Sequence, residues 1–109
     1  MNISPFQKKV YDACSLIPKG KVSTYKLLSD YLKSHPRAIG QALKRNPYAP
    51  EIPCHRVIAS DFSLYGYKGK TSGNDLKLKE NLLRNEGVLF HNGLLIEKNK
   101  VFHFIERTL

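Results

Sequence analysis

Apolar side chains that recur every three or four positions predict an amphipathic helix near the start of the chain. Ser4 can cap this helix, and Pro5 is tolerated at its first position. Pro18 and Gly20 end the pattern. The apolar stripe consists of Phe6, Val10, Ala13, Cys14 and Ile17. Because Cys14 lies on this stripe, we expect it to be an inert core residue.

Two further helices are predicted between residues 24 and 45. Thr24 can cap the first of them, whose inward side chains are Leu27, Leu28, Tyr31 and Leu32. A break at Ser34-His35 separates it from a helix that runs from Pro36 to Arg45, where Asn46-Pro47 stops it. Two helices joined by so tight a break predict a helix-turn-helix motif, with the later helix as the recognition helix.

This recognition helix has two different faces. Ile39 and Leu43 are placed to face the core, while Arg37, Gln41 and Lys44 share another face. The positions between them hold small residues, namely Ala38, Gly40 and Ala42. A glycine inside a helix costs about 1 kcal/mol relative to alanine. Gly40 therefore indicates either a partner that comes very close, such as a DNA minor groove, or the close packing of another helix.

A stiff loop leads into an apolar run in the middle of the chain. Residues 46–53 include three prolines, each of which fixes one backbone angle and removes an amide donor. The loop is suited to holding Cys54 in one place. The run from Ile52 to Ile58 is predicted to be a short buried strand or turn. Residues 61–70 form a loop with Gly and Tyr that can supply one wall of a pocket.

A last helix is predicted from about Asn74 or Asp75 to Glu86, with Gly87 as its C-cap. Residues 88–96 then alternate in polarity around Asn92-Gly93, which predicts a hairpin or wing.

The final apolar run, 101–105, packs at a place that the pattern does not reveal. We expect one domain over residues 1–109 with a mainly α fold and a small β component, in a winged helix-turn-helix-like DNA-binding architecture.

The charge balance adds a class of partner to this picture. The chain has 18 Lys and Arg against 9 Asp and Glu, a formal net charge of +9. Ten of the basic residues and only three of the acidic ones lie in residues 1–56. A field of this sign attracts polyanions and releases their counterions, so nucleic acid is the expected partner. A merely soluble basic domain would have the same composition.

Composition also disfavours other classes of protein. No apolar run approaches the about 20 residues of a membrane span, and the N-terminus lacks the pattern of a signal peptide. We expect no membrane partner and an intracellular location, cytoplasmic or with the DNA of a nucleus or nucleoid. Cys14 and Cys54 are too few for a disulfide framework and lack the spacing of a zinc site, so reduced thiols are expected.

Cys54 and His55 set a thiol beside an imidazole. A cysteine attacks as its thiolate, and a nearby imidazole or cation lowers its ordinary pKa of about 8.5. Adjacent residues point in different directions, so a bridging water or an unusual turn is needed to pass a proton between them. The carboxylates that could fix the tautomer of His55 are Glu51, Asp61, Glu80 and Glu86. On the dipeptide alone, a buried cysteine beside a surface histidine is equally compatible.

Four segments carry a resemblance to a known family. They are GKVSTY at 20–25, RAIGQALKRNP at 37–47, IPCHRVI at 52–58 and LLRNEG at 82–87. In order and spacing they resemble the DNA-binding domain of O6-alkylguanine-DNA alkyltransferases, also called methylated-DNA-protein-cysteine methyltransferases. The resemblance covers about residues 5–88, and the segment 88–109 extends past the family core.

The resemblance implies a DNA repair protein that acts once on double-stranded DNA carrying O6-alkylguanine. Cys54 looks like the acceptor that takes the alkyl group irreversibly from guanine O6. His55 would act through a water, and Glu86 would orient His55. Asn46 resembles the asparagine that braces the turn around the active site. The base must leave the stack for in-line attack, at a cost of a few kcal/mol, and a filler side chain offsets part of it.

The resemblance also assigns DNA-binding and pocket positions, for a monomer that binds the minor groove. Arg37 looks like the arginine finger that fills the gap left by the flipped nucleotide, and Tyr25 like the tyrosine that pushes on the adjacent phosphate. The other expected DNA-binding residues are Ala38, Gly40, Gln41, Lys44, Arg45 and Arg56. The expected pocket residues are Leu43, Pro53, Val57, Tyr67, Lys68 and Gly69.

Two departures from the family pattern are expected to matter. We expect the usual N-terminal domain to be missing, and with it any metal site that some members carry there, so we predict no metal and no cofactor. Lys68 stands where many members have a serine that contacts the alkylated base. A lysine there could add a donor to the leaving group or stay exposed.

Two other functions compete with alkyl transfer. Alkyltransferase-like proteins flip the same base without repairing it and recruit excision repair, but they usually carry Trp or Ala in place of the acceptor thiol. This chain has Cys54. A plain helix-turn-helix transcription factor would leave Cys54-His55 unexplained.

Overall fold

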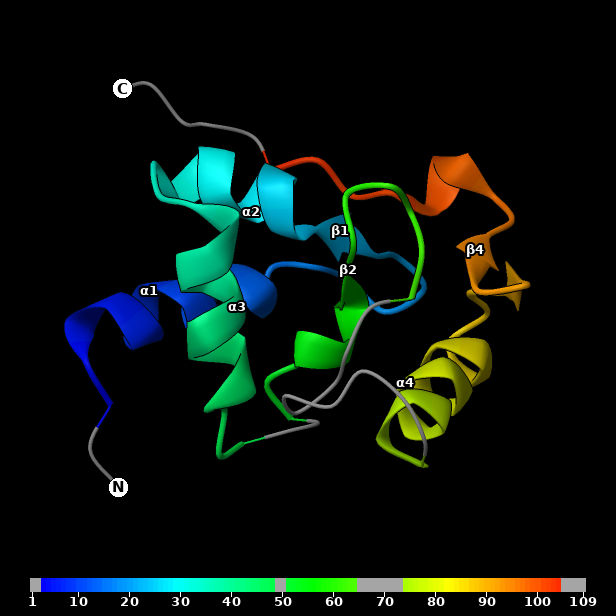
Figure 1. The fold of residues 1–109 in the computed structure, drawn as a ribbon, viewed down its shortest axis with the longest axis horizontal. Coiled ribbons are helices and arrows are strands. Elements are labelled where there is room, and N and C mark those ends of the chain that lie inside the picture. Colours follow the sequence, from blue (N-terminus) through cyan, green and yellow to red (C-terminus); the bar gives the residue numbers. More distant parts are fainter. Residues whose placement is uncertain (1–2, 49–50, 65–73, 105–109) are drawn as a thin grey trace.

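The structure is a computed structural model that describes residues 3–48, 51–64 and 74–104. Helices α1, α2 and α3 lie on one side of it, and α4 and the β3–β4 hairpin lie on the other (Figure 1). In chain order the elements are α1 (Pro5–Cys14), β1 (Ser23–Thr24), α2 (Tyr25–Leu32), α3 (Pro36–Lys44), the 3-10 helix η1 (Cys54–Arg56), β2 (Val57–Ile58), α4 (Asn74–Asn85), β3 (Phe90–His91), β4 (Leu94–Leu95) and the 3-10 helix η2 (Lys98–Lys100). The predicted class, mainly α with a small β component, is confirmed.

Helix α1 begins where the sequence predicts. The Ser4 side chain accepts from the backbone amide of Gln7, and the Gln7 side chain accepts from the amide of Ser4, which makes a capping box. The helix ends at Cys14, earlier than the apolar pattern suggested, because the chain tightens into turns in which Ile17 donates to the Cys14 carbonyl. Ile17 is nevertheless fully buried.

Helices α2 and α3 form the predicted helix-turn-helix pair. The Thr24 hydroxyl accepts from the amide of Leu27 at 3.1 Å and caps α2. Lys33 then adopts a left-handed conformation with φ of 56°, and Ser34 donates back to the Ser29 carbonyl at 2.8 Å. This closing turn lets α3 follow α2 with only three residues between them.

Strands β1 and β2 tie the start of α2 to the segment around Cys54. They pair in parallel, with Ser23 opposite Val57 and Thr24 opposite Ile58. The predicted buried strand or turn at 52–58 is therefore both, since the η1 turn leads directly into β2. The backbone around Cys54 is fixed to the helix-turn-helix motif by this pairing.

The C-terminal part of the fold closes α4 and adds the predicted hairpin. Gly87 has a φ of +87°, and Val88 donates to the Leu83 carbonyl, as in a Schellman C-cap. Strands β3 and β4 pair antiparallel around Asn92-Gly93, both of which have positive φ.

The last described segment returns to the first half of the fold. Phe102 donates its amide to the Val22 carbonyl, and the Phe104 ring stacks on Tyr31 with centroids 4.8 Å apart. This contact gives the apolar run 101–105 a place that the sequence pattern alone could not supply, apart from residue 105, which lies outside the described residues.

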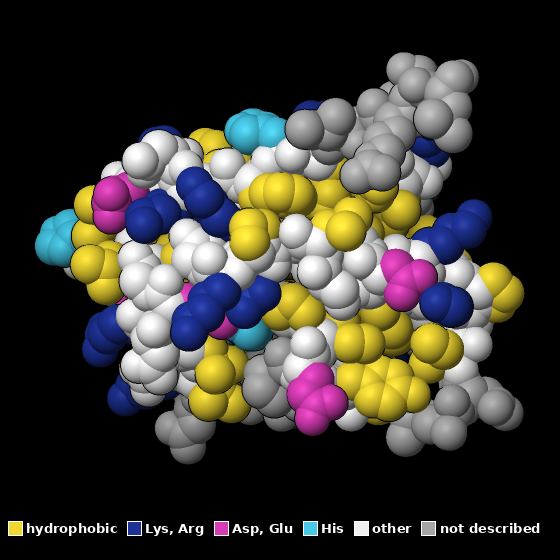
Figure 2. Space-filling model, turned by 180° about the vertical axis from the view of Figure 1, so that it is seen from behind, with side chains coloured by type: hydrophobic (Ala, Val, Ile, Leu, Met, Phe, Trp, Pro, Cys, Tyr) yellow, Lys and Arg dark blue, Asp and Glu magenta, His cyan; other side chains and the backbone are white. Residues whose placement is uncertain are grey.

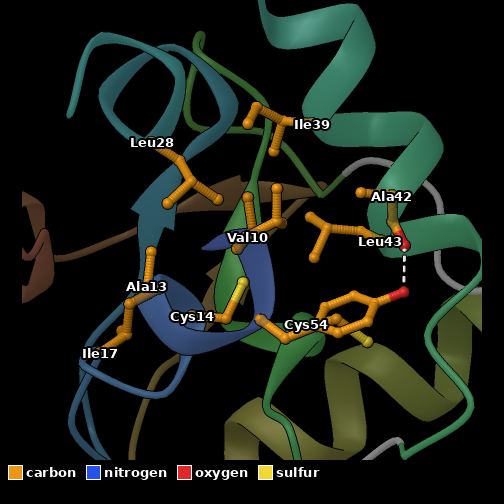
Figure 3. Close-up of a cluster of buried hydrophobic side chains, with 11 residues drawn as sticks. Val10, Ala13, Cys14, Ile17, Leu28, Ile39, Ala42, Leu43 and Cys54 are labelled. Carbon is orange, nitrogen blue, oxygen red and sulfur yellow. Dashed lines mark hydrogen bonds between the residues drawn. The ribbon is translucent and has the colours of Figure 1, made fainter. Parts of the chain in front are cut away.

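The core consists of two clusters. The larger one joins α1, α2, α3 and η1, and it contains both cysteines (Figure 3). The smaller one joins α4 and the hairpin to β1 and β2, and its buried members are Val22, Ile58, Leu83, Val88 and Leu95. Cys14 is confirmed as a core residue, and its burial raises the pKa of its thiol well above the ordinary value.

The surface mixes charged and apolar side chains. Figure 2 shows hydrophobic side chains reaching the surface between Lys and Arg side chains on the face seen from behind. Within the described ranges, none of the helices combines the length and the apolar character needed to cross a membrane.

Candidate active site

Cys54 opens the η1 turn, with its side chain 5 % exposed at the edge of the larger core cluster. Its amide donates to the Ile52 carbonyl at 2.8 Å. The Asn46 side-chain amide donates to the same carbonyl at 3.1 Å, and its oxygen accepts from the amide of Tyr48 at 2.9 Å. Asn46 thus braces the loop that precedes Cys54 at both ends.

His55 is also buried, and it points toward the end of α4. Its Nε2 lies 3.1 Å from Oε2 of Glu86. Of the four carboxylates that the sequence left open, the structure brings Glu86 to His55. The other ring nitrogen, Nδ1, is buried and has no hydrogen-bond partner among the described residues. Burial lowers the pKa of His55, and the hydrogen bond and charge of Glu86 counteract it only in part, so the imidazole is neutral at pH 7.

Arg56 holds Glu86 from the other side. Its Nε and Nη2 donate to the two carboxylate oxygens of Glu86 at 2.9 and 2.8 Å, and its Nη1 donates to the Ile17 carbonyl at 2.8 Å. Burial alone would raise the pKa of Glu86, but the hydrogen bonds from Arg56 and His55 outweigh it and keep the pKa below its ordinary value. The family resemblance assigns Arg56 to DNA, and that assignment stays a prediction; within the protein its guanidinium is engaged by Glu86 and the Ile17 carbonyl, because a buried carboxylate needs such a partner.

Lys79 is a site residue that the sequence reasoning missed. It lies on α4, is fully buried, and donates from Nζ to the Val57 carbonyl at 2.8 Å. Burial lowers its pKa to about 7, and the charge of Cys54 acts in the opposite direction. A signal was present, because Lys79 lies three residues after Leu76 and four before Leu83, in the inward stripe of the helix.

Tyr11 is a second residue that sequence reasoning overlooked. Its hydroxyl donates to the Ala42 carbonyl at 2.8 Å, which joins α1 to the recognition helix (Figure 3). Burial raises the pKa of Tyr11, and the charges of Cys54 and Cys14 raise it further. Tyr11 thus contacts α3 and belongs to the same core cluster as Cys54.

Comparison with known proteins is consistent with this geometry. Residues 5–88 match the family model described as 6-O-methylguanine DNA methyltransferase, DNA binding domain. The chain belongs to this family.

Curated relatives agree. A methylated-DNA--protein-cysteine methyltransferase of Thermococcus sibiricus is 46 % identical over 86 residues, which are 78 % of this chain and 46 % of the relative. One from Saccharolobus islandicus is 48 % identical over 84 residues, 77 % of this chain and 52 % of the relative. The chain thus spans about half the length of the curated relatives it matches.

Solved structures show two kinds of similar protein. The O6-methylguanine-DNA methyltransferase of Pyrococcus kodakaraensis is 44 % identical, with a TM-score of 0.70 over 79 % of this chain and 48 % of that one. An ATL protein of S. pombe in complex with DNA is 32 % identical, with a TM-score of 0.74 over 94 % of this chain and 98 % of that one.

Helix α3 is the predicted recognition helix, and its outer face is exposed to solvent. The side chains of Arg37, Gln41, Lys44 and Arg45 are exposed, and Ala38 and Gly40 are half-buried. A Cβ built on Gly40 would meet no atom within 4 Å. Packing against another described part of the protein therefore does not require this glycine.

The remaining family positions are only partly described. Leu43, Pro53 and Val57 are buried, and Leu43, Val57 and Cys54 share the larger cluster. Tyr25 is half-buried at the start of α2 and packs against the same cluster. Tyr67, Lys68 and Gly69 lie outside the described residues. Among those that are described, no group of three or more His, Cys, Asp or Glu could hold a metal ion.

Proposed function

We propose that this protein repairs DNA by transferring an alkyl group from guanine O6 in a duplex to its own Cys54, irreversibly and once. The observation that carries this proposal is the arrangement at η1, where Cys54 precedes a buried His55 that is paired with Glu86. Membership of the methyltransferase family supports it. A structural cysteine would have no need of an adjacent imidazole held by a buried carboxylate.

The reaction forms one bond and breaks one. The Cys54 thiolate attacks the alkyl carbon in line, a C–S bond forms, and the C–O6 bond breaks. The thiol proton passes to His55, which is neutral because its pKa is lowered. A water bridges the two groups, and the unpartnered Nδ1 of His55 is the acceptor suited to it. The guanine stays in the DNA and becomes anionic when the C–O6 bond breaks; it takes up a proton as the His55 imidazolium returns the thiol proton through water, so that a proton replaces the alkyl group.

Asn46 and Glu86 hold the reacting groups in position. Asn46 fixes the Ile52 carbonyl that also binds the Cys54 amide, so it limits the movement of the nucleophile. Glu86 accepts from His55 Nε2 and thereby favours the tautomer whose Nδ1 carries no proton. We assign pocket-wall roles to Leu43, Pro53, Val57, Tyr67, Lys68 and Gly69.

DNA binding falls to α3, inserted in the minor groove. Arg37 at its first turn fills the gap left by the flipped nucleotide, Tyr25 pushes on the adjacent phosphate, and Gly40 lets the groove approach the backbone. The contacts to the duplex come from Ala38, Gln41, Lys44 and Arg45. Solved relatives in complex with DNA support this assignment.

Mass spectrometry tests the proposal. The protein is incubated with duplex DNA that carries one O6-methylguanine, and its intact mass and peptides are measured. We expect one added methyl group on the peptide that contains Cys54, and an unmodified protein would refute the proposal. Undamaged duplex of the same sequence is the control.

A second function, lesion binding without repair, has one observation in its favour. The S. pombe ATL protein matches 94 % of this chain and is itself covered to 98 %. Cys54 speaks against it, because a lesion sensor needs no acceptor thiol. If the protein binds the lesion as tightly after Cys54→Ser and the wild type transfers no methyl group, the sensor function is the correct one.

A further inference from the structure

Lys79 places an amine in the interior directly behind the catalytic turn. Its side chain is completely buried, and its Nζ donates to the Val57 carbonyl at 2.8 Å. The Val57 amide in turn donates to the carbonyl of Cys54. The Lys79 amine on α4 and the backbone of Cys54 in η1 are thus linked by two successive hydrogen bonds through Val57.

Burying a lysine at this position costs free energy. A buried ammonium group loses its hydration, and a hydrophobic side chain of similar volume would avoid that cost. Burial lowers the pKa of Lys79 to about 7, whereas the Cys54 thiolate raises it. This interaction is reciprocal, so a protonated Lys79 favours the thiolate by the same amount.

We propose that Lys79 is a positioning residue whose ammonium group stabilises the thiolate of Cys54 from the interior side of the η1 turn. The inference rests on the proposed function, since a thiolate is useful only if Cys54 is the acceptor. The hydrogen bond to Val57 holds the amine in place. Together, the thiolate and the ammonium group hold one proton fewer than a separate thiol and a separate ammonium group would hold at neutral pH.

The other charged groups near η1 do not supply this cation. Burial lowers the pKa of His55, and Arg56 and Lys79 lower it further against the effect of Glu86, so His55 is not an imidazolium at neutral pH. The Arg56 guanidinium is taken up by Glu86 and the Ile17 carbonyl. On α4 itself, Glu80 lies 3.6 Å from Arg84 at the surface. Among these basic groups, Lys79 is the one whose pKa the charge of Cys54 raises.

A purely structural role for Lys79 makes a different prediction. If the residue only binds the Val57 carbonyl, its loss would slow alkyl transfer equally at every pH. If it stabilises the thiolate, its loss would slow transfer at neutral pH and the rate would recover in alkaline solution, where the thiol ionises unaided.

The direct test titrates the Cys54 thiolate by its ultraviolet absorbance in the absence of DNA. Each protein is measured against the same protein with Cys54→Ser, so that the signals of Cys14 and the tyrosines cancel. Lys79→Met removes the charge, Lys79→Gln removes it but keeps a donor for the Val57 carbonyl, and Lys79→Arg keeps the charge. Lys77→Met, at an exposed position of the same helix, is the matched control.

We expect Lys79→Met and Lys79→Gln each to raise the titration midpoint of Cys54 by about one pH unit or more, about tenfold less thiolate at neutral pH. Lys79→Arg restores the wild-type midpoint at least in part, and Lys77→Met leaves it unchanged. An unchanged midpoint in whichever of the two uncharged variants folds would overturn the proposal. Because no DNA is present, this failure is separate from a failure to transfer methyl groups.

Discussion

Two groups of cations in this fold, one buried and one exposed, differ in almost every physical respect. In the interior, Arg56 and Lys79 are largely or fully buried, and both are hydrogen-bonded within the protein. On the outside, Arg37, Lys44 and Arg45 of α3 are exposed to solvent. Buried charges change the pKa of their neighbours, whereas exposed charges act on a partner and are screened by salt.

The comparison separates two tasks that one small domain has to perform. We expect the interior cations to set the protonation of Cys54 and the orientation of Glu86, which in turn holds His55. The exterior cations provide attraction to a polyanion and do not need a fixed geometry before it arrives. Changes on the inside are therefore expected to alter the reaction, and changes on α3 are expected to alter DNA binding.

The largest expected effect is a complete loss of methyl transfer without a loss of DNA binding. Cys54→Ser removes the acceptor, so we expect methyl transfer to fall below detection, while binding to duplex DNA stays within about twofold because α3 is untouched. Mass spectrometry and fluorescence anisotropy measure the two quantities. A comparable loss of binding would show that the inner and outer regions are not separable.

We expect Glu86→Gln to disrupt the buried contacts of His55 and Arg56 more than the loss of any surface carboxylate would. It leaves the Arg56 guanidinium without its carboxylate and His55 without its anionic acceptor, so we expect a loss of about 2 to 3 kcal/mol in the free energy of unfolding. Transfer should slow by about a hundredfold. Chemical denaturation and single-turnover rates measure these effects.

The matched control is Glu80→Gln on α4, the helix that ends just before Glu86. Glu80 pairs with an exposed Arg84 at 3.6 Å, so its loss should cost less than about 0.5 kcal/mol and leave transfer unchanged. Equal effects of the two substitutions would contradict the special role of the buried pair.

The outer region is tested by Arg37→Ala. We expect repair of duplex DNA to weaken by about tenfold, and reaction with a free alkylguanine base to change little, because the side chain serves base flipping and not displacement. The salt dependence of binding should also become shallower by about one unit. Lys9→Ala removes an exposed charge from α1 as a control, and equal losses on both substrates would refute the role of Arg37.

The last effect concerns the dependence of stability on pH. Lys79 has an ordinary pKa of 10.5 and a pKa of about 7 in the fold. Between these values the unfolded chain binds more protons, so the free energy of unfolding should rise with pH, by about 1.4 kcal/mol per unit.

This rise should be visible between pH 7 and about 8.5, and it should be absent in Lys79→Met. At higher pH, Cys14 acts in the opposite direction, because its raised pKa keeps a proton that the unfolded chain loses. Denaturation series at several pH values measure the slope. A wild-type slope that persists in Lys79→Met would assign it to another group.

The exposed residues of α3 could be predicted from the sequence better than the buried groups around Cys54. The polar residues of α3 recur at helical spacing, and the caps at Ser4 and Thr24 follow from local rules, so these features need no tertiary information. The pairing of His55 with Glu86 joins residues 31 apart in the chain, and residue spacing alone could not choose it among four carboxylates.

Arg56 and Lys79 show why buried charges are hard to predict. Arginine and lysine are almost always exposed, so the residue type alone predicts a surface position for both. Arg56 is engaged by a carboxylate thirty residues away, and Lys79 is buried because the inward stripe of α4 packs against η1 and β2. Both contacts depend on how distant elements pack.

Counting methyl groups decides whether Cys54 is an acceptor that is used once. The protein is mixed with a molar excess of duplex carrying O6-methylguanine, and the methyl groups lost from DNA and gained by the protein are counted over time. We predict that both counts stop at one methyl group per protein molecule and that all of it is on Cys54. Continued loss of lesions after the protein is fully modified, or a protein that stays unmodified, would contradict the account.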